Sequence, residues 1–95
     1  MFRLFTGKEA DQRSARIVNR GTCLVRMGKK GVSLAVDWAP EGDPEFIIYI
    51  RTDTKWETPV SEPVSEAEIA EMLDFIPKEL RKRERVEASI ELIAI

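Results

Sequence analysis

Apolar and polar residues alternate over several stretches of the chain, and these stretches are the expected β-strands. Residues 32–38 place an apolar side chain at every second position, which is the period of a strand with one buried face. Trp38 falls on that apolar face, so we expect it in the core. Residues 22–27 alternate in the same way, and the turn at 28–31, with a glycine at each end, predicts a hairpin between the two strands. A shorter β-rich stretch begins at Ile17.

Two more strands are predicted, separated by a helix. Residues 46–51 are apolar on both faces, which is typical of a strand inside a sheet. Residues 86–95 alternate again and form the last strand. The segments 39–44 and 52–64 hold prolines and are expected to be connections, and the polar residues 6–15 are expected to be a loop or a short turn.

The helix has a clear predicted beginning. Ser65 and Glu68 form a capping box, in which each side chain accepts a hydrogen bond from the backbone N–H of the other residue. An apolar stripe at helical spacing follows, made of Ile69, Met72, Leu73 and Ile76. Pro77 lacks the N–H that a continuing helix needs, so we expect the helix to stop or kink there. Residues 78–85 add a further turn, anchored by Leu80.

The order of these elements, β-β-β-β-α-β, predicts the α+β class. We expect two layers, in which an antiparallel sheet of four to five strands carries one main helix on one face. The 95 residues have the size of one domain, residues 1–95, in which only the basic segment 1–18 has no assigned structure. The face away from the helix is then partly bare and marks a contact site or a dimer seam. Its expected apolar residues are Ile47, Tyr49, Ile93 and Ile95.

Composition excludes several kinds of chemistry. The chain has no histidine and one cysteine, Cys23, so a disulfide framework, a histidine–cysteine zinc site and a histidine-based triad are excluded. Cys23 lies in an alternating strand, where a thiol usually acts as a small inert hydrophobe. The acids Glu41, Asp43 and Glu45 lack the ligand order of a calcium-binding loop. We therefore predict no enzyme activity, no cofactor and no metal.

The sequence also bears on location. No apolar run approaches the roughly 20 residues that cross a bilayer. The first residues lack the apolar core of a secretory signal. We therefore expect a cytoplasmic protein without membrane contact.

Charge is unevenly distributed along the chain. Residues 1–30 hold eight basic and two acidic side chains, whereas residues 31–74 hold eleven acidic and two basic ones. Such blocks either match the surface of a partner or neutralise each other in the folded chain. The basic block raises the alternative of a nucleic-acid-binding domain. The pI near 5.2 and the absence of aromatic residues among the basic ones after Phe5 argue against that alternative.

Trp56 has two open interpretations. It lies in the proline-bounded connection beside Lys55 and Glu57, away from any apolar period. Tryptophan is enriched among the side chains that dominate protein–protein binding, which favours an exposed anchor. The alternative is that Trp56 folds back as a lid over the core between helix and sheet.

Several short motifs follow one another from Asn19 to the last residue. They are an Arg-Gly pair at 20–21, a glycine-containing hairpin at 28–31, a hydrophobic strand ending in an aromatic at 46–49, a Trp-acid-x-Pro element at 56–59, a Pro-x-Ser-Glu approach to the helix at 63–66 and a last strand with glutamates at 87 and 91. In this order and spacing the chain resembles a family of small immunity proteins from bacterial polymorphic-toxin and contact-dependent inhibition systems, the family numbered seventy-four. Asp37 and Trp38 stand where that family has a Gly-Glu pair, and residues 1–18 fall outside the resemblance.

The resemblance implies a non-catalytic protein, monomeric or homodimeric, that neutralises a cognate toxin domain by blocking its active or substrate surface. Toxin domains that attack nucleic acid present basic surfaces, so the acidic middle of the chain would steer association. Tyr49 and, in one interpretation, Trp56 supply anchors, with acids around them as rim charges. The expected partner-binding residues are Trp56, Glu57, Tyr49, Asp53, Glu62, Glu41 and Asp43.

Overall fold

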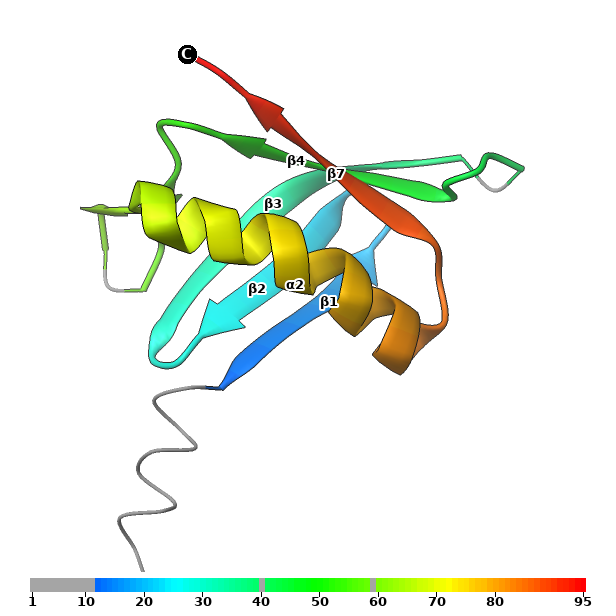
Figure 1. The fold of residues 1–95 in the computed structure, drawn as a ribbon, viewed down its shortest axis with the longest axis horizontal. Helices are drawn as coiled ribbons and strands as arrows, with labels where there is room; N and C mark the ends of the chain where they lie inside the picture. Colours follow the sequence, from blue (N-terminus) through cyan, green and yellow to red (C-terminus); the bar gives the residue numbers. More distant parts are fainter. Residues whose placement is uncertain (1–11, 40, 59) are drawn as a thin grey trace, which may run out of the picture.

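A helix packed on one face of a five-stranded sheet forms the molecule (Figure 1). The computed structural model describes residues 12–39, 41–58 and 60–95. In chain order the elements are β1 (Arg13–Asn19), β2 (Thr22–Met27), β3 (Lys30–Trp38), β4 (Phe46–Arg51), β5 (Lys55–Trp56), β6 (Glu62–Pro63), α2 (Glu66–Glu84) and β7 (Ala88–Ile93). The predicted α+β class and its two layers are confirmed.

The strands of the large sheet are ordered β1-β2-β3-β4-β7. The pairs β1–β2, β2–β3 and β3–β4 are antiparallel, as predicted, and β7 is parallel to β4. The prediction fails for this last pair because α2 crosses one face of the sheet and returns the chain in its original direction, which makes a β-α-β crossover. Within the connection after β4, β5 and β6 form a separate two-stranded ribbon that the sequence analysis leaves as a loop.

Strand β1 starts earlier than the sequence predicts. Residues 13–15 belong to the strand rather than to a loop, with Ala15 buried opposite Val25 of β2. The sequence shows no clear alternation here, because Arg13, Ser14 and Arg16 are polar and the small Ala15 is the one apolar residue that marks the buried face. The rest of the predicted loop, residues 6–11, lies outside the described residues.

The beginning of α2 follows the predicted capping box. The Glu68 N–H donates to Ser65 Oγ (3.1 Å), and the Ser65 N–H donates to Glu68 Oε1 (2.9 Å). The helix then buries one stripe against the sheet, made of Ile69, Met72, Ile76 and Leu80. Leu73, predicted in the same stripe, is half-buried at its margin.

Pro77 does not end the helix. A single helix runs through it to Glu84 and closes at Arg85, which has a left-handed backbone (φ 56°). The predicted stop is therefore wrong, and the predicted extra turn anchored by Leu80 is confirmed. Leu80 is fully buried one turn after Ile76. The burial of its side chain, about 1.5–3 kcal/mol, offsets much of the cost of a proline inside a helix.

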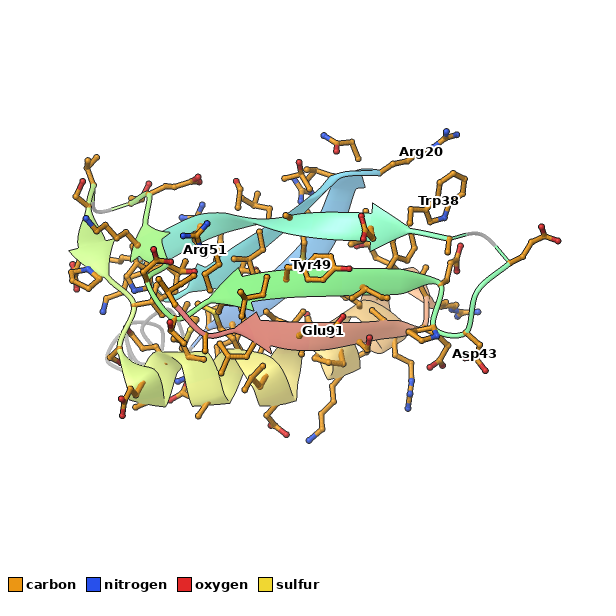
Figure 2. The ribbon with its side chains drawn as sticks, turned by 90° about the horizontal axis from the view of Figure 1, so that it is seen from above. Arg20, Trp38, Asp43, Tyr49, Arg51 and Glu91 are labelled. Carbon is orange, nitrogen blue, oxygen red and sulfur yellow. The ribbon has the colours of Figure 1, made fainter. Side chains whose placement is uncertain are left out.

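The other face of the sheet is left uncovered by the described part of the chain (Figure 2). Trp38, expected in the core, is only half-buried at the end of β3. There it packs against the margin of the core, and the Arg20 guanidinium lies 4.3 Å from its ring centroid. Within the described ranges, no helix is both long and apolar enough to cross a membrane.

Candidate protein-binding surface

Tyr49 stands at the centre of the uncovered face, midway along the inner strand β4 (Figure 2). The strand register places Ala35 of β3 on one side of it and Glu91 of β7 on the other. We call this region the Tyr49 face and define it by the outward side chains of β3, β4 and β7 around the tyrosine: Asp37, Ile47, Tyr49, Arg51, Glu91 and Ile93. The expected bare apolar residues Ile47, Tyr49 and Ile93 all belong to it.

A hydrogen bond fixes the tyrosine ring. The Tyr49 hydroxyl donates to Asp37 Oδ2 at 2.7 Å. This hydrogen bond, helped by partial burial and by the negative charges of Asp37 and Glu91, raises the pKa of Tyr49. The phenol therefore stays protonated at neutral pH, and its ring is held in one orientation before any partner arrives.

An open depression of about 450 Å³ adjoins the ring. Ala35 and Ile93 give it an apolar lining, and Ser33 and Thr54 lie at its polar margin. In this lining the small side chain of Ala35 lies opposite the ring of Tyr49. A protruding apolar side chain of a partner fits such a surface.

The charges around this depression are mostly negative. Arg51 binds Asp53 through two hydrogen bonds, Nε to Oδ1 (2.9 Å) and Nη2 to Oδ2 (3.0 Å). The Arg51 hydrogen bond lowers the pKa of Asp53, although burial opposes it. The two opposite charges of this ion pair largely balance each other. Asp37 and Glu91 are exposed, and neither forms an ion pair within the described residues.

Glu57 extends the acidic rim. It is exposed, and its Oε1 accepts a hydrogen bond from Ser33 Oγ at 3.1 Å. Because Ser33 lines the depression, Glu57 belongs to the same region as Tyr49. Of the predicted rim charges, Glu57 and Asp53 lie here, although Asp53 is neutralised by Arg51.

Trp56 is part of the core. Its side chain is 1% exposed, and its indole Nε1 donates to Glu68 Oε1 at 3.2 Å. The β5–β6 ribbon pairs Trp56 with Glu62 and holds the ring inward. The prediction that Trp56 is a partner-binding anchor is therefore wrong, since it has almost no surface to offer. The alternative that it folds back over the core is confirmed.

Glu62 is also engaged within the fold. The Lys30 ammonium lies 3.1 Å from Glu62 Oε1 and 2.6 Å from Glu68 Oε2, and 5.8 Å from the centroid of the Trp56 ring. Burial opposes the ionisation of Glu68, but the hydrogen bonds from Lys30, Ser65 and Trp56 prevail and lower its pKa to about 2. Glu62 therefore helps to hold the connection onto α2 and is not a free rim charge, which corrects its predicted role.

Glu41 and Asp43 lie at the opposite end of the sheet. Both are exposed in the loop between β3 and β4, and neither has an ion pair within the described residues. Asp43 and Arg51 mark the two ends of the uncovered face in Figure 2. The seven predicted residues are therefore not one site: Tyr49, Asp53 and Glu57 come together, two acids stand apart from them, and Trp56 and Glu62 belong to the fold.

Three residues of the Tyr49 face, Asp37, Arg51 and Glu91, are missing from the prediction. Asp37 has a signal in the sequence, because it occupies an outward position of an alternating strand. Glu91 also occupies an outward position of an alternating strand, but only the parallel register of β7 places it beside Tyr49.

Cys23, the one cysteine of the chain, adds no reactive thiol to this surface. Cys23 is buried, and burial, with a smaller contribution from the charge of Glu84, raises the pKa of its thiol to about 12. The thiol is thus protonated and inert, as predicted. In the described ranges, three histidine, cysteine or acidic side chains nowhere gather closely enough to hold a metal ion.

Comparison of the chain with protein-family models, with curated proteins and with solved structures gives no match. Its function is therefore inferred from the surface described above and from the sequence motifs.

Proposed function

We propose that this chain is an immunity protein that binds a toxin domain through the Tyr49 face and blocks the active or substrate surface of that domain. The observation that carries the proposal is the uncovered sheet face, on which a fixed tyrosine lies beside an apolar depression. The acids around it include Asp37, Glu57 and Glu91, which form no ion pair within the described residues. The order of motifs from Asn19 onward, which resembles the immunity family, supports the same role.

The physical basis is an aromatic anchor inside a charged rim. Tyrosine is among the residues that dominate binding energy at protein interfaces, because its large rigid ring is buried at little cost in conformational entropy. The hydrogen bond to Asp37 already holds the ring, so less conformational entropy is lost when a partner binds. Tyr49 thus takes the role that the sequence analysis divides between Tyr49 and Trp56.

The acidic rim indicates the chemistry of the partner. Asp37, Glu91 and Glu57 favour a basic surface, such as the substrate surface of a toxin that acts on nucleic acid. Charge complementarity of this kind raises the association rate and makes it fall with ionic strength.

The test is rescue from a toxin. The toxin domain encoded beside this chain is produced in bacteria together with wild type, Tyr49→Ala or Leu24→Ala, and growth and co-purification are measured. Leu24 is the control at the margin of this surface, because it is a half-buried side chain on β2, opposite Ser33 and two strands away from Tyr49. We expect Tyr49→Ala to lose rescue and Leu24→Ala to retain it. Equal rescue by both variants would remove the Tyr49 face from the proposal, and absence of wild-type rescue would remove the immunity function.

A specific observation also favours nucleic acid as a second candidate partner. Residues 12–36 contain six basic side chains and no acidic one. Arg13 and Lys30 pair with acids from other elements, while Arg16 and Arg26 line one depression on the uncovered side of β1 and β2. Two results would support this candidate: binding of single-stranded RNA whose logarithmic affinity falls linearly with the logarithm of salt concentration, and loss of that binding in the double variant Arg16→Glu, Arg26→Glu. No binding at low salt would exclude it.

A further inference from the structure

The two edges of the sheet are protected to different degrees. An edge strand exposes unpaired backbone groups, and proteins usually block it with charged residues, prolines, bulges or covering elements. Edge strand β1 has such protection: it carries Arg13 and Arg16, its register is irregular between Ile17 and Asn19, and the Ile17 N–H donates to Glu84 Oε1 at 2.6 Å. Edge strand β7 has no lysine, arginine, proline or bulge, and Glu91 is its one charged residue.

The backbone of β7 has a free outer side. The Phe46 N–H donates to the Glu87 carbonyl (3.1 Å) and the Thr52 N–H to the Ile93 carbonyl (3.0 Å), so the odd-numbered residues of this segment bond to β4. Alternate residues of a strand turn their N–H and C=O groups to opposite sides. The backbone groups of Ala88, Ile90 and Leu92 therefore point away from β4. Within the described part of the chain, no hydrogen bond occupies them.

This edge is also apolar. Leu92 is 45% exposed, Ile93 42% and Ile95 73%. Beside Leu92 lies a groove of about 350 Å³ between β7 and the first half of α2, with Val64, Ile69, Ala70 and Leu73 among its lining residues. The end of the strand is held in place, since the Ile95 N–H donates to Thr52 Oγ1 at 3.0 Å. The exposed apolar groups therefore sit on an ordered backbone.

We propose that a second copy of this chain pairs with β7 in antiparallel orientation, with the two-fold axis at Ile90, so that the two sheets join into one. The free backbone groups are symmetric about Ile90, because Ala88 and Leu92 flank it at equal spacing. Around this axis Ile90 faces Ile90 of the second copy, and the small Ala88 faces the larger Leu92. A two-fold contact of this kind uses the same patch on both subunits and closes after two copies.

Charge selects this register. With the axis at Ile90, Glu91 of one copy faces Ser89 of the other, a carboxylate opposite a hydroxyl. With the axis at Glu91, two glutamates would face each other, which is unfavourable for a directly opposed pair. Glu87, the other acid near the edge, is already paired with Arg81 at 3.1 Å, so it does not repel the second copy.

The size of the contact sets the expected affinity. One edge strand and the adjoining groove bury less than the roughly 1,600 Å² of a standard interface, so we expect dissociation in the micromolar range rather than an obligate dimer. The pairing leaves the Tyr49 face uncovered and places two such faces side by side. Dimerisation is measured on the chain alone, so it and toxin binding succeed or fail independently.

The first test is the mass in solution over a concentration series, by analytical ultracentrifugation. Leu92→Lys places a charge on the β7 edge, and Val18→Lys is the matched control on the β1 edge, since both side chains are 45% exposed. We expect wild type and Val18→Lys to shift from 10.9 kDa to twice that mass as concentration rises. We expect Leu92→Lys, folded by circular dichroism, to remain a monomer. A wild type that is monomeric throughout, or a dimer that Leu92→Lys leaves intact, would overturn the proposal.

The second test reads the register and does not depend on Leu92. In the proposed register, residues 89 and 91 of opposite copies are non-hydrogen-bonded neighbours with Cα atoms about 4.5 Å apart, which suits a disulfide. Two copies of residue 91 lie on a diagonal of about 7–8 Å, which does not. The double variant Ser89→Cys, Glu91→Cys should therefore form a covalent dimer under mild oxidation, and Glu91→Cys alone should not. The reverse outcome, or no cross-link in either, would exclude the register.

Discussion

At the scale of single residues, Glu68 connects three parts of the fold. Its carboxylate accepts from the backbone of Ser65, from the indole of Trp56 and from the ammonium of Lys30. One side chain thus caps α2, receives the polar atom of a buried tryptophan and ties the start of β3 to the helix. Trp56 and Glu62, which the sequence suggests as partner-binding residues, instead attach the connection between β4 and α2 to the rest of the fold.

Acid should remove the stabilisation that ionised Glu68 provides, over a defined pH range. The folded state lowers the pKa of Glu68 from 4.5 to about 2, so the stabilisation is fully present above 4.5 and is lost as pH falls toward 2. We expect Glu68→Gln, which keeps the cap, to be less stable than wild type at neutral pH and to lose less stability between pH 4.5 and 2. The measurement is urea unfolding across pH, with Glu66→Gln on the exposed first turn as control. Parallel curves for wild type and Glu68→Gln would contradict the assignment.

Trp56 should contribute to stability rather than to partner binding. Trp56→Ala removes a fully buried ring and should cost about 3–5 kcal/mol of unfolding free energy. Trp56→Phe keeps most of the packing, loses the hydrogen bond to Glu68 and should cost on the order of 1 kcal/mol. Chemical denaturation measures both. A loss below about 1 kcal/mol for Trp56→Ala would show that the ring is not in the core.

At the scale of elements, the strands and the helix that have a regular apolar pattern could be predicted from the sequence, and the elements without one could not. Strands β2, β3 and β4 each carry an uninterrupted apolar face, and α2 has a capping box. The start of β1 has only Ala15 to mark its buried face. The β5–β6 ribbon pairs two residues of each strand, too few to show a period. The parallel direction of β7 depends on the path of α2 over the sheet, which no local pattern records.

Pro77 gives an element-scale prediction. The helix continues through it because Leu80, three residues later, is fully buried, so the missing N–H is a cost that the fold tolerates. Pro77→Ala restores a donor to the helix interior and should raise the unfolding free energy by about 1–3 kcal/mol. Thermal and urea unfolding measure the change. An unchanged or lower stability would mean that the packing of the half-buried proline ring outweighs the missing hydrogen bond.

At the scale of the whole molecule, the sequence predicts an uncovered face and its apolar residues, but not the charged residues around them. Tyr49, Ile47 and Ile93 could be placed there because they oppose the buried positions of their strands. The role given to Trp56 could not be decided, since its burial depends on contacts with Lys30 and Glu68 from distant parts of the chain. Only the assembled sheet shows which acids lie beside Tyr49, which are paired within the fold and which lie at the far end of the sheet. The acidic block of the sequence therefore does not form one surface.

The central claim is that the Tyr49 face binds a basic protein surface, and a pair of charge reversals tests it most directly. Glu91→Lys places a lysine beside Tyr49, and Asp74→Lys makes the same change of net charge on the outer side of α2, where Asp74 forms only an exposed pair with Lys78. Both variants, first checked for equal folding, are measured for affinity and association rate with the purified toxin domain. We predict at least about a tenfold loss of affinity and slower association for Glu91→Lys, and wild-type values for Asp74→Lys. Equal effects of the two variants, or none from Glu91→Lys, would contradict the claim.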